Sequence, residues 1–367
     1  MSEIEMVQRP LPEQRYGAEL AQLREEDAGL ARPPGWQLTP RSVLAFVLGD
    51  EGRGIAPKFV GSRRFVERCV VALATQRGLM LIGEPGTAKS YLSELLAAGI
   101  SGDSTLTIQG SAGTTEDTIK YSWNYALLLA EGATERSLVA APLYLGMEKG
   151  QIVRFEEITR CPLEIQDTLL SVLSERAMVI PEFSGSKRML LAQAGFNVIA
   201  TANTRDRGVN EMSAALKRRF NFETVQPIPD WEAEKRLIER ETAGLLAAAG
   251  IPLRLSGDIT SLLVATFQAL RTGRTAGGRT VERVSTVMST AEAVAVGYAA
   301  GVHAYYYDDE QAVRPAHLVQ SLLGSALKDS DGDRAILGRY FEEVVKRERD
   351  GLWPAYYAGY VEMERDG

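Results

Sequence analysis

A glycine-rich segment at residues 83–90, Gly-Glu-Pro-Gly-Thr-Ala-Lys-Ser, has the residue types and spacing of a phosphate-binding loop. The apolar run 79–82 precedes it and a helical pattern follows it, which is the strand–loop–helix setting that such a loop requires. Glycines allow successive backbone N–H groups to face a phosphate, and the start of the helix adds its positive dipole end. We expect Lys89 to contact the β- and γ-phosphates of a nucleotide and the Ser90 hydroxyl to hold Mg²⁺.

Two adjacent carboxylates, Glu156 and Glu157, end a second predicted strand at 151–155. Nucleotide hydrolases with such a loop need an acid directed toward the magnesium and a base directed toward the attacking water. We expect this strand to lie next to the strand that leads into the loop. Glu156 would then orient Mg²⁺ or its water, and Glu157 would polarise the nucleophilic water. The alternative is that the two acids are ordinary surface residues at the end of a strand.

An amide side chain, Asn203, ends a further predicted strand at 197–202. We expect it to hold the same water, or the γ-phosphate, from the other side of the site. The alternative is that Asn203 is a turn residue, because asparagine is common where strands end.

A short predicted helix at 214–220 presents two arginines, Arg218 and Arg219, beside an aromatic residue. A guanidinium supplied across a subunit boundary stabilises the charge of phosphoryl transfer and accelerates the reaction on the order of a thousandfold or more. The alternative is a solvated basic helix end.

These residues require a sheet that brings the ends of their strands together. The apolar runs are 79–82, 105–109, 151–155 and 197–202, and the helical stretches between them include 65–76 and 90–99. Such alternation predicts an α/β fold, in which a parallel sheet carries helices on both faces.

Two prolines in the segment 226–230 mark a linker, because they cannot continue a helix or a central strand. The helices predicted after it are 231–249, 256–270, 289–305, 315–327 and 334–349. We therefore predict three parts: an N-terminal extension at 1–35, a nucleotide-binding core at 36–226 and a helical domain at 227–367. The extension contains a short polar helix at 13–30, which we interpret as an arm.

The composition of the chain restricts the other classes to which it can belong. Its 367 residues suffice for roughly two ordinary domains, and 45% of them are hydrophobic, which excludes a disordered chain. A net charge of −7 disfavours nucleic-acid binding over the whole surface. Cys69 and Cys161 lack the spacing of a metal site or disulfide framework and indicate a reducing compartment. Because neither a membrane span nor a signal peptide is recognisable, we expect a cytoplasmic protein without membrane contact.

Together these segments resemble the AAA+ ATPases and, within them, the MoxR-like branch, over about residues 59–222. The resembling motifs are the adenine-side element at 59–61, Walker A at 83–90, Walker B at 155–160, sensor 1 at 200–203 and the arginine-finger helix at 216–220. The resemblance implies a P-loop AAA+ αβα core with a parallel sheet, followed by an all-α lid domain.

Residue by residue, these motifs imply three sets of site residues. The ATP-binding set is Val60, Gly61, Gly83, Glu84, Pro85, Gly86, Thr87, Ala88, Lys89, Ser90 and Tyr91. The Mg²⁺-binding set is Ser90 and Glu156, and the catalytic set is Glu157, Asn203, Arg218 and Arg219.

Two positions depart from the family pattern. Glu156 stands where the Walker B motif has aspartate, so a longer side chain must fit the magnesium shell. Residues 289–292 are predicted to form a capping box that opens a lid helix, and Ala291 occupies the position of the sensor 2 arginine. Arg279 and Arg283 could replace that arginine from the preceding loop, or could be solvated loop residues.

The resemblance implies a ring-forming ATPase, a hexamer by family pattern, that uses ATP and Mg²⁺ to remodel a partner protein in a chaperone-like way. It also implies a partner with a von Willebrand factor A-type domain. One alternative is a ring motor acting on nucleic acid through a pore of local basic residues. Another is a scaffold that binds ATP and assembles with little turnover, which Glu156 and Ala291 favour.

Two further segments are candidates for contact with a partner. Residues 110–125 lie where relatives carry a pore-facing insertion, and residues 184–188 are predicted to form a hairpin tip before sensor 1. Trp123 and Tyr125 would contact a partner if exposed, and packing against the core is the alternative.

Overall fold

The computed structural model describes residues 8–203, 210–308, 312–324 and 331–366, and the chain divides into two compact units. The first comprises Met1–Gly83 and Ala88–Val225, and the second comprises Glu84–Thr87 and Gln226–Gly367. Among the described residues, no helix combines the length and the apolar character that a membrane crossing requires.

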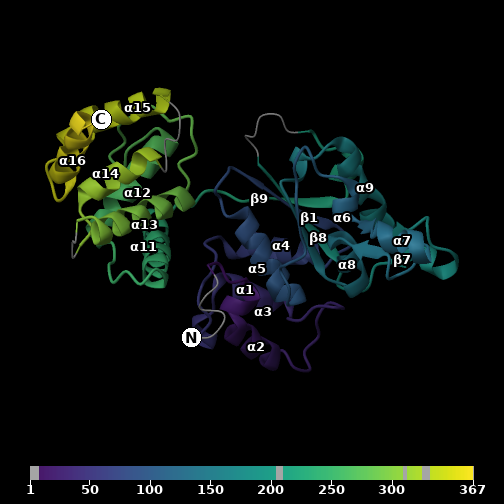
Figure 1. The fold of residues 1–367 in the computed structure, drawn as a ribbon. Coiled ribbons are helices and arrows are strands. Elements are labelled where there is room, and N and C mark those ends of the chain that lie inside the picture. The colour runs from purple at the N-terminus through teal and green to yellow at the C-terminus, as the bar shows by residue number, and fades with distance from the viewer. Residues whose placement is uncertain (1–7, 204–209, 309–311, 325–330, 367) are drawn as a thin grey trace. The chain divides into compact units, whose positions relative to one another are not determined.

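A five-stranded parallel sheet forms the centre of the first unit (Figure 1). Its order is β2 (Thr107–Gln109), β5 (Ile152–Glu156), β8 (Asn197–Asn203), β1 (Gly78–Gly83) and β9 (Phe220–Thr224). The parallel sheet is as predicted, but the expectation that the acidic strand neighbours β1 is wrong, because β8 lies between them. The edge strand β9 was not predicted, because the polar residues Asn221 and Glu223 alternate with its two phenylalanines.

Helices cover both faces of this sheet, as predicted. The alternation of side chains along β1 shows the two faces, because Leu79 and Leu81 belong to one buried cluster and Met80 to another. The helices that contribute buried residues to the first cluster include α3 (Pro40–Leu48), α4 (Arg63–Leu73) and α5 (Lys89–Ser101), and those of the second include α8 (Pro142–Lys149) and α9 (Leu163–Glu175).

The N-terminal segment packs on the core and is not a projecting arm. It forms α1 (Pro12–Arg15) and α2 (Gly17–Glu26) in place of the single helix predicted at 13–30. Leu20 and Leu23 of α2 are fully buried in the first cluster, and this burial explains why the segment stays on the core.

Two small antiparallel sheets extend the first unit away from the central sheet. One pairs β3 (Tyr121–Trp123) with β4 (Leu138–Ala140), and the other pairs β6 (Ala177–Val179) with β7 (Met189–Leu191). The short elements around them are α6 (Glu116–Ile119), α7 (Tyr125–Glu131) and the 3₁₀ helix η4 (Gly185–Arg188). The hairpin predicted around 184–188 is therefore confirmed.

The aromatic residues of these small sheets differ in exposure. Trp123 packs edge-on against Phe183, with ring centroids 5.6 Å apart, and its indole N–H donates to Glu182. Tyr125 is 70% exposed. Trp123 is half-buried, so Tyr125 is the more exposed of the two candidate partner contacts.

The second unit is helical, as predicted. Its helices are α11 (Trp231–Ala248), α12 (Gly257–Thr272), α13 (Thr290–Tyr306), α14 (Pro315–Leu322), α15 (Asp331–Glu343) and α16 (Trp353–Asp366). A single buried cluster that includes Phe267, Phe341 and Tyr356 joins them. Helix α16 was not predicted, and part of the helix predicted at 315–327 lies outside the described residues.

Candidate nucleotide-binding site

The phosphate-binding loop connects β1 to α5 through two residues in the left-handed region. Gly86 has φ +74° and Ala88 has φ +64°, and the latter is rare for a residue with a side chain. Lys89 is 7% exposed, and its Nζ donates to the Gly83 carbonyl at 3.2 Å. The Thr87 hydroxyl donates to the Glu84 carbonyl at 2.8 Å. The predicted loop residues thus form one tight turn in which the lysine ammonium folds back to the Gly83 carbonyl.

The Glu156 carboxylate is 4% exposed and accepts hydrogen bonds on both oxygens. Oε2 lies 2.6 Å from the Ser90 hydroxyl and 2.8 Å from the Thr201 hydroxyl. Oε1 lies 2.7 Å from the Ser93 hydroxyl and 3.0 Å from Arg154 Nη2. The structure therefore brings Ser90 and Glu156 together as oxygen donors of the kind that Mg²⁺ prefers, so these residues fit the metal implied by the motif.

Glu157 follows Glu156 in a strained conformation at the carboxyl end of the sheet. Its φ of +54° lies in the left-handed region, and such outliers cluster at functional sites. Its backbone N–H donates to the Thr201 hydroxyl at 3.0 Å, and its side chain pairs with Arg160 at 2.8 Å. Asn203 Nδ2 lies 3.5 Å from its other carboxylate oxygen. Glu157 and Asn203 are therefore neighbours, as the prediction of a shared water requires.

The position of β8 changes the expected layout. Because β8 lies between β1 and β5, Asn203 stands beside Gly83 in the strand register and does not reach the site from the far side. Thr201 of the same strand contacts both Glu156 and the backbone of Glu157. The central strand therefore links the two acids to the phosphate-binding loop.

A glycine that the sequence analysis did not single out permits this arrangement. The N–H of Gly110, just after β2, donates to the Glu156 carbonyl at 2.7 Å. A Cβ atom at this position would stand 2.4 Å from the Glu157 carbonyl oxygen, which is closer than real Cβ contacts. Only glycine therefore allows this close approach to the two acids.

The adenine-side residues lie on the N-terminal side of α4. Phe59 is buried and stacks with Phe65, with ring centroids 6.2 Å apart, whereas Val60 is half-buried and Gly61 is exposed. The Tyr91 hydroxyl is 3.0 Å from that of Tyr16, so α5 is joined to the N-terminal segment beside the phosphate-binding loop.

The two predicted arginines follow α10 (Ala214–Lys217) and stand apart from the acids. Arg219 is half-buried, donates to the Ala215 carbonyl at 2.6 Å and contacts the Ser174 hydroxyl. Arg218 is exposed. Within the described parts of this chain, neither guanidinium contacts Glu156 or Glu157.

The helical unit begins its helix α13 with the predicted capping box. The Ser289 hydroxyl accepts from the Glu292 N–H at 3.2 Å, and Glu292 accepts from the Ser289 N–H at 2.8 Å. Ala291 is exposed in the first turn. Of the two upstream arginines, Arg279 donates to the Glu343 carbonyl at 3.2 Å, and Arg283 is exposed.

A second group of metal-ligand residue types occurs in the helical unit. His303, Asp308 and His317 place their ligand atoms within 4.8 Å of one another. The Arg314 N–H donates to His317 Nδ1 at 3.0 Å, so the other ring nitrogen carries the proton and donates to Asp308 at 2.8 Å. This hydrogen bond lowers the pKa of Asp308, and the Arg314 guanidinium at 2.9 Å supplies a cation. Asp308 and His317 therefore satisfy each other, whereas the buried Nδ1 of His303 lies 3.8 Å from Asp308 Oδ2 and has no hydrogen-bond partner among the described residues.

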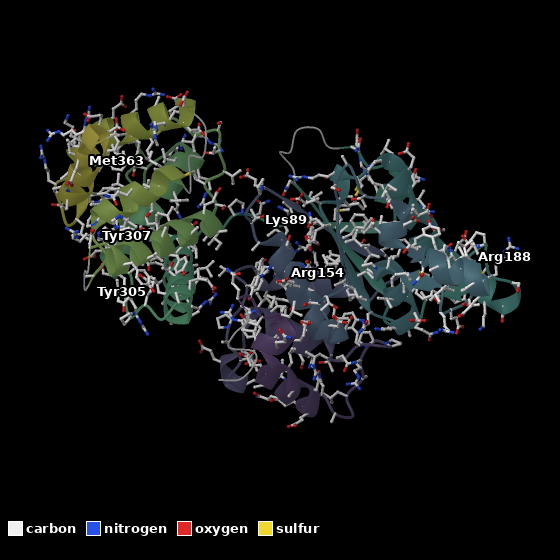
Figure 2. The ribbon with its side chains drawn as sticks, in the orientation of Figure 1. Lys89, Arg154, Arg188, Tyr305, Tyr307 and Met363 are labelled. Atoms are coloured by element: carbon white, nitrogen blue, oxygen red, sulfur yellow. The ribbon has the colours of Figure 1, made fainter. Side chains whose placement is uncertain are left out.

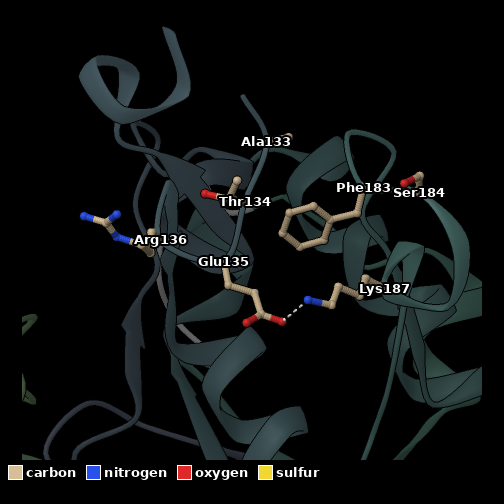
Figure 3. Close-up of a pocket in the computed structure, with 7 residues that line it drawn as sticks. All are labelled: Ala133, Thr134, Glu135, Arg136, Phe183, Ser184 and Lys187. Atoms are coloured by element: carbon tan, nitrogen blue, oxygen red, sulfur yellow. Dashed lines mark ion pairs between the residues drawn. The ribbon is translucent and has the colours of Figure 1, made fainter. Parts of the chain in front are cut away.

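An open pocket of about 330 Å³ lies between residues 133–136 and the hairpin tip (Figure 3). Lys187 and Glu135 form an ion pair at 2.9 Å across it. None of its lining residues belongs to the phosphate-binding loop, so this pocket is separate from the candidate nucleotide site.

Comparison with known proteins agrees with this geometry. A family model described as the AAA domain of the dynein-related subfamily matches residues 78–220, and one described as the YehL-like AAA+ ATPase C-terminal domain matches residues 232–357. The uncharacterized protein YehL of Escherichia coli (strain K12) is 54% identical over 354 residues, which cover 96% of each chain. The chain belongs to the MoxR-like AAA+ ATPases.

Two more distant similarities accompany this family match. Chaperone MoxR1 of Mycobacterium tuberculosis is 30% identical over 204 residues, which are 55% of this chain and 50% of MoxR1. A crystal structure of NtrX from Brucella abortus in complex with ADP matches with a TM-score of 0.50 and 15% identity, over 82% of this chain and 64% of that one. At this identity the NtrX match shows the fold alone.

Several polar residues of this AAA+ site lie outside the predicted sets. They are Ser93, Arg154 and Thr201. Arg154 and Thr201 carried a signal in the sequence, since each is a polar residue within an otherwise apolar strand. Buried polar groups need partners, so such positions indicate a polar cluster in the fold.

Proposed function

We propose that this MoxR-like AAA+ protein is a Mg²⁺-dependent ATPase that works as a homo-oligomeric ring, a hexamer by family pattern. The observation that carries the proposal is the convergence of Ser90, Glu156, Glu157 and Asn203 at the carboxyl ends of β5 and β8, beside the phosphate-binding loop. In α/β sheets of this type, ligands bind at the carboxyl ends of the strands.

Residues 36–226 would bind the nucleotide, and residues 227–367 would form the lid. The loop residues 83–88 would surround the phosphates with backbone N–H groups, and Lys89 would contact the β- and γ-phosphates. Val60, Gly61 and Tyr91 would line the adenine side. The buried position of the Lys89 ammonium supports this role, because a buried ammonium requires anionic or carbonyl partners.

Hydrolysis would divide its tasks between the two acids. Ser90 and Glu156 would hold Mg²⁺, which when bound neutralises the charge on the phosphates. Glu157 would polarise the attacking water and accept its proton, while Asn203 would hold that water in place. The 3.5 Å separation of Asn203 and Glu157 supports a shared water, because both side chains can reach it.

The ring would complete the site. Arg219, with Arg218 beside it, would reach the γ-phosphate bound by a neighbouring subunit. The cycle would drive a chaperone-like action on a partner protein, as the name of MoxR1 indicates for that relative. The resemblance favours a partner with a von Willebrand factor A-type domain.

A second candidate is an ATP-dependent scaffold with little turnover. Two observations favour it: glutamate replaces aspartate at position 156, and the exposed Ala291 offers no guanidinium where sensor 2 is expected. A motor acting on nucleic acid is disfavoured by the net charge of −7.

Phosphate release and nucleotide binding together separate these candidates. The wild type should release phosphate from Mg²⁺–ATP, Lys89→Ala should lose ATP binding, and Glu157→Gln should keep binding but lose turnover, since an amide is a very weak base. Binding and ATP-dependent assembly without phosphate release would favour the scaffold. Turnover that rises only with added DNA or RNA would favour the motor, and unchanged ATP affinity of Lys89→Ala would contradict the loop assignment.

A further inference from the structure

The most heavily bonded side chain beside the candidate magnesium site is an arginine to which the motifs assign no role. Arg154 is 5% exposed and lies two residues before Glu156 on β5 (Figure 2). Because side chains alternate along a strand, residues 154 and 156 lie on the same face. Phe155, between them, belongs to the buried cluster on the opposite face.

The Arg154 guanidinium is fixed by four groups besides Glu156. Nε donates to the Ser93 hydroxyl at 2.9 Å, and Nη1 donates to the Ser104 carbonyl and the Thr107 hydroxyl at 3.0 Å each. Nη2 reaches the Ser90 carbonyl at 3.3 Å. The arginine therefore does not depend on Glu156 for its position.

A second carboxylate stands on the other side of this arginine. Glu94 of α5 lies 3.6 Å from Arg154 Nη1, and its other oxygen accepts from Arg9 at 2.7 Å. Arg154 thus keeps a carboxylate neighbour even when Glu156 shares its charge with a metal ion. An arginine held in this way can keep the Glu156 carboxylate in one orientation.

The two oxygens of Glu156 face different partners as a result. Oε1 is taken by Arg154 and Ser93, whereas Oε2 faces the Ser90 hydroxyl, the other candidate metal ligand. Glutamate has one more rotatable bond than aspartate, so it loses more side-chain freedom when it is held in one orientation. We propose that Arg154 is the positioning residue for Glu156: it holds Oε1 so that Oε2 remains directed at the metal position beside Ser90. This inference rests on the proposed magnesium-dependent nucleotide binding.

The test measures how much Mg²⁺ tightens the binding of a fluorescent, non-hydrolysable ATP analogue to the full chain. In the wild type, Mg²⁺ should raise the affinity. In Arg154→Met this gain should fall about tenfold or more, as for other residues that orient metal ligands, while affinity without Mg²⁺ stays within about twofold. A merely structural role would lower both affinities together.

The matched control is Arg176→Met, since Arg176 is a half-buried arginine of the same unit whose guanidinium, among the described residues, donates to two backbone carbonyls and lies over the Phe196 ring. It should leave the magnesium-linked gain unchanged even where the melting temperature falls. A double-mutant cycle with Glu156→Asp adds a second readout. Aspartate is too short to keep the Arg154 contact. Adding Arg154→Met to Glu156→Asp should therefore lower the magnesium-linked gain in affinity by less than about threefold.

Three results would overturn the inference. The first is a wild-type increase in affinity with Mg²⁺ in Arg154→Met. The second is an equal decrease of that magnesium-linked gain when Arg154→Met is introduced into the wild type and into Glu156→Asp. The third is a wild type whose affinity Mg²⁺ does not raise. If Arg154→Met does not fold, Arg154→Lys replaces it, and a gain equal to the wild type then counts against the inference. Phosphate release is measured separately, so a protein that shows the gain without turnover would contradict the proposed hydrolysis and leave the role of Arg154 standing.

Discussion

The nucleotide-binding core and the helical unit each contain a buried arginine–glutamate pair, and the two pairs differ in what surrounds them. Arg154 and Glu156 are joined by one contact at 3.0 Å, and Glu156 uses its other oxygen for Ser90 and Thr201. Arg271 and Glu234 are joined by two contacts, at 2.8 and 3.0 Å. Only one oxygen of Glu156 contacts its arginine, so the other faces the candidate magnesium position, whereas both oxygens of Glu234 contact Arg271.

The remaining contacts of the helical pair are also structural. Glu234 of α11 is fully buried and accepts from Gln268 of α12 and from Thr290, the first residue of α13. Arg271 donates to the Met288 carbonyl at 3.1 Å, just before the start of α13. This pair joins three helices. The comparison teaches how to interpret a buried ion pair. The pair is a candidate for function when one partner also contacts a residue of the site, and it is structural when all contacts of both partners join elements of the fold.

The largest effect is expected from breaking the helical pair. Glu234→Gln leaves the Arg271 charge buried without its counter-ion, so the free energy of unfolding of the helical unit should fall by about 3 kcal/mol. Trp231 and Trp353 lie in this unit, and tryptophan fluorescence during urea unfolding measures the change.

Two further variants make this test specific. Glu232→Gln changes an exposed glutamate on the same helix and should alter stability by less than about 0.5 kcal/mol. Glu234→Leu combined with Arg271→Met removes both charges and should recover part of the loss. Equal stability of Glu234→Gln and Glu232→Gln would show that the buried pair does not stabilise the unit.

The next effect concerns an arginine with no carboxylate contact within the described residues. Arg219 lies at the surface of the core and is held by a carbonyl and a hydroxyl. If it acts on the nucleotide of a neighbouring subunit, Arg219→Ala should lower ATP turnover tenfold or more while nucleotide binding stays nearly intact. Lys217→Ala, which removes a neighbouring exposed cation paired with Glu211, is the control and should keep turnover.

Mixing subunits tests whether Arg219 acts across the boundary. Arg219→Ala mixed with Glu157→Gln should regain some turnover, because interfaces form in which a wild-type Glu157 faces a wild-type Arg219. Phosphate release across mixing ratios, with subunit exchange confirmed, gives the answer. Turnover that stays at background in every mixture would reject the trans-acting role, and a monomeric mass with normal turnover would reject the ring.

The local parts of the site could be predicted from the sequence because neighbouring residues determine them. The strand, turn and helix at 78–101 follow from one apolar run, two glycines and a helix-forming segment. Family motifs paired Ser90 with Glu156 across 66 positions. The position of β8 between β1 and β5 could not be predicted in this way, since the order of parallel strands depends on long connections that carry no local signal.

The contacts of Arg154 could not be predicted for a related reason. Its partners Ser93, Ser104 and Thr107 are 47 to 61 positions away and come from α5 and from the chain around β2. A charged residue in an apolar strand indicates that a buried partner exists, but only the packing of α5 against β5 shows which residues provide it.

A smaller effect, dependent on pH, is expected in the helical unit at Asp333. Burial raises the pKa of this carboxyl group, but hydrogen bonds from the backbone N–H groups of Ser285 and Thr286 and from the Ser285 hydroxyl outweigh burial and lower it. A lowered pKa in the folded state stabilises the fold above the unfolded pKa near 3.8, and this contribution is lost as pH falls through the folded value.

Asp333→Asn should therefore destabilise the helical unit at pH 7 by about 1–2 kcal/mol, the scale of hydrogen bonds to a charged group. The difference from the wild type should shrink as the pH falls below 4. Urea unfolding at several pH values measures both. A difference that is the same at pH 7 and pH 3 would contradict the role of the charge.

The smallest expected effect is that a thiol reagent does not react with the folded core. This labelling test shows whether the two units unfold independently. Both cysteines of the chain, Cys69 and Cys161, lie in the core, and both are fully buried. Burial, together with the nearby Glu223, raises the pKa of Cys69 to about 12, so about one part in ten thousand is thiolate at pH 8. A thiol reagent at pH 8 should therefore leave folded protein unlabelled at Cys69 and label it only when the core opens. In Glu234→Gln, urea concentrations that unfold the helical unit should still leave Cys69 unreacted, whereas rapid labelling at those concentrations would show that the two units unfold together.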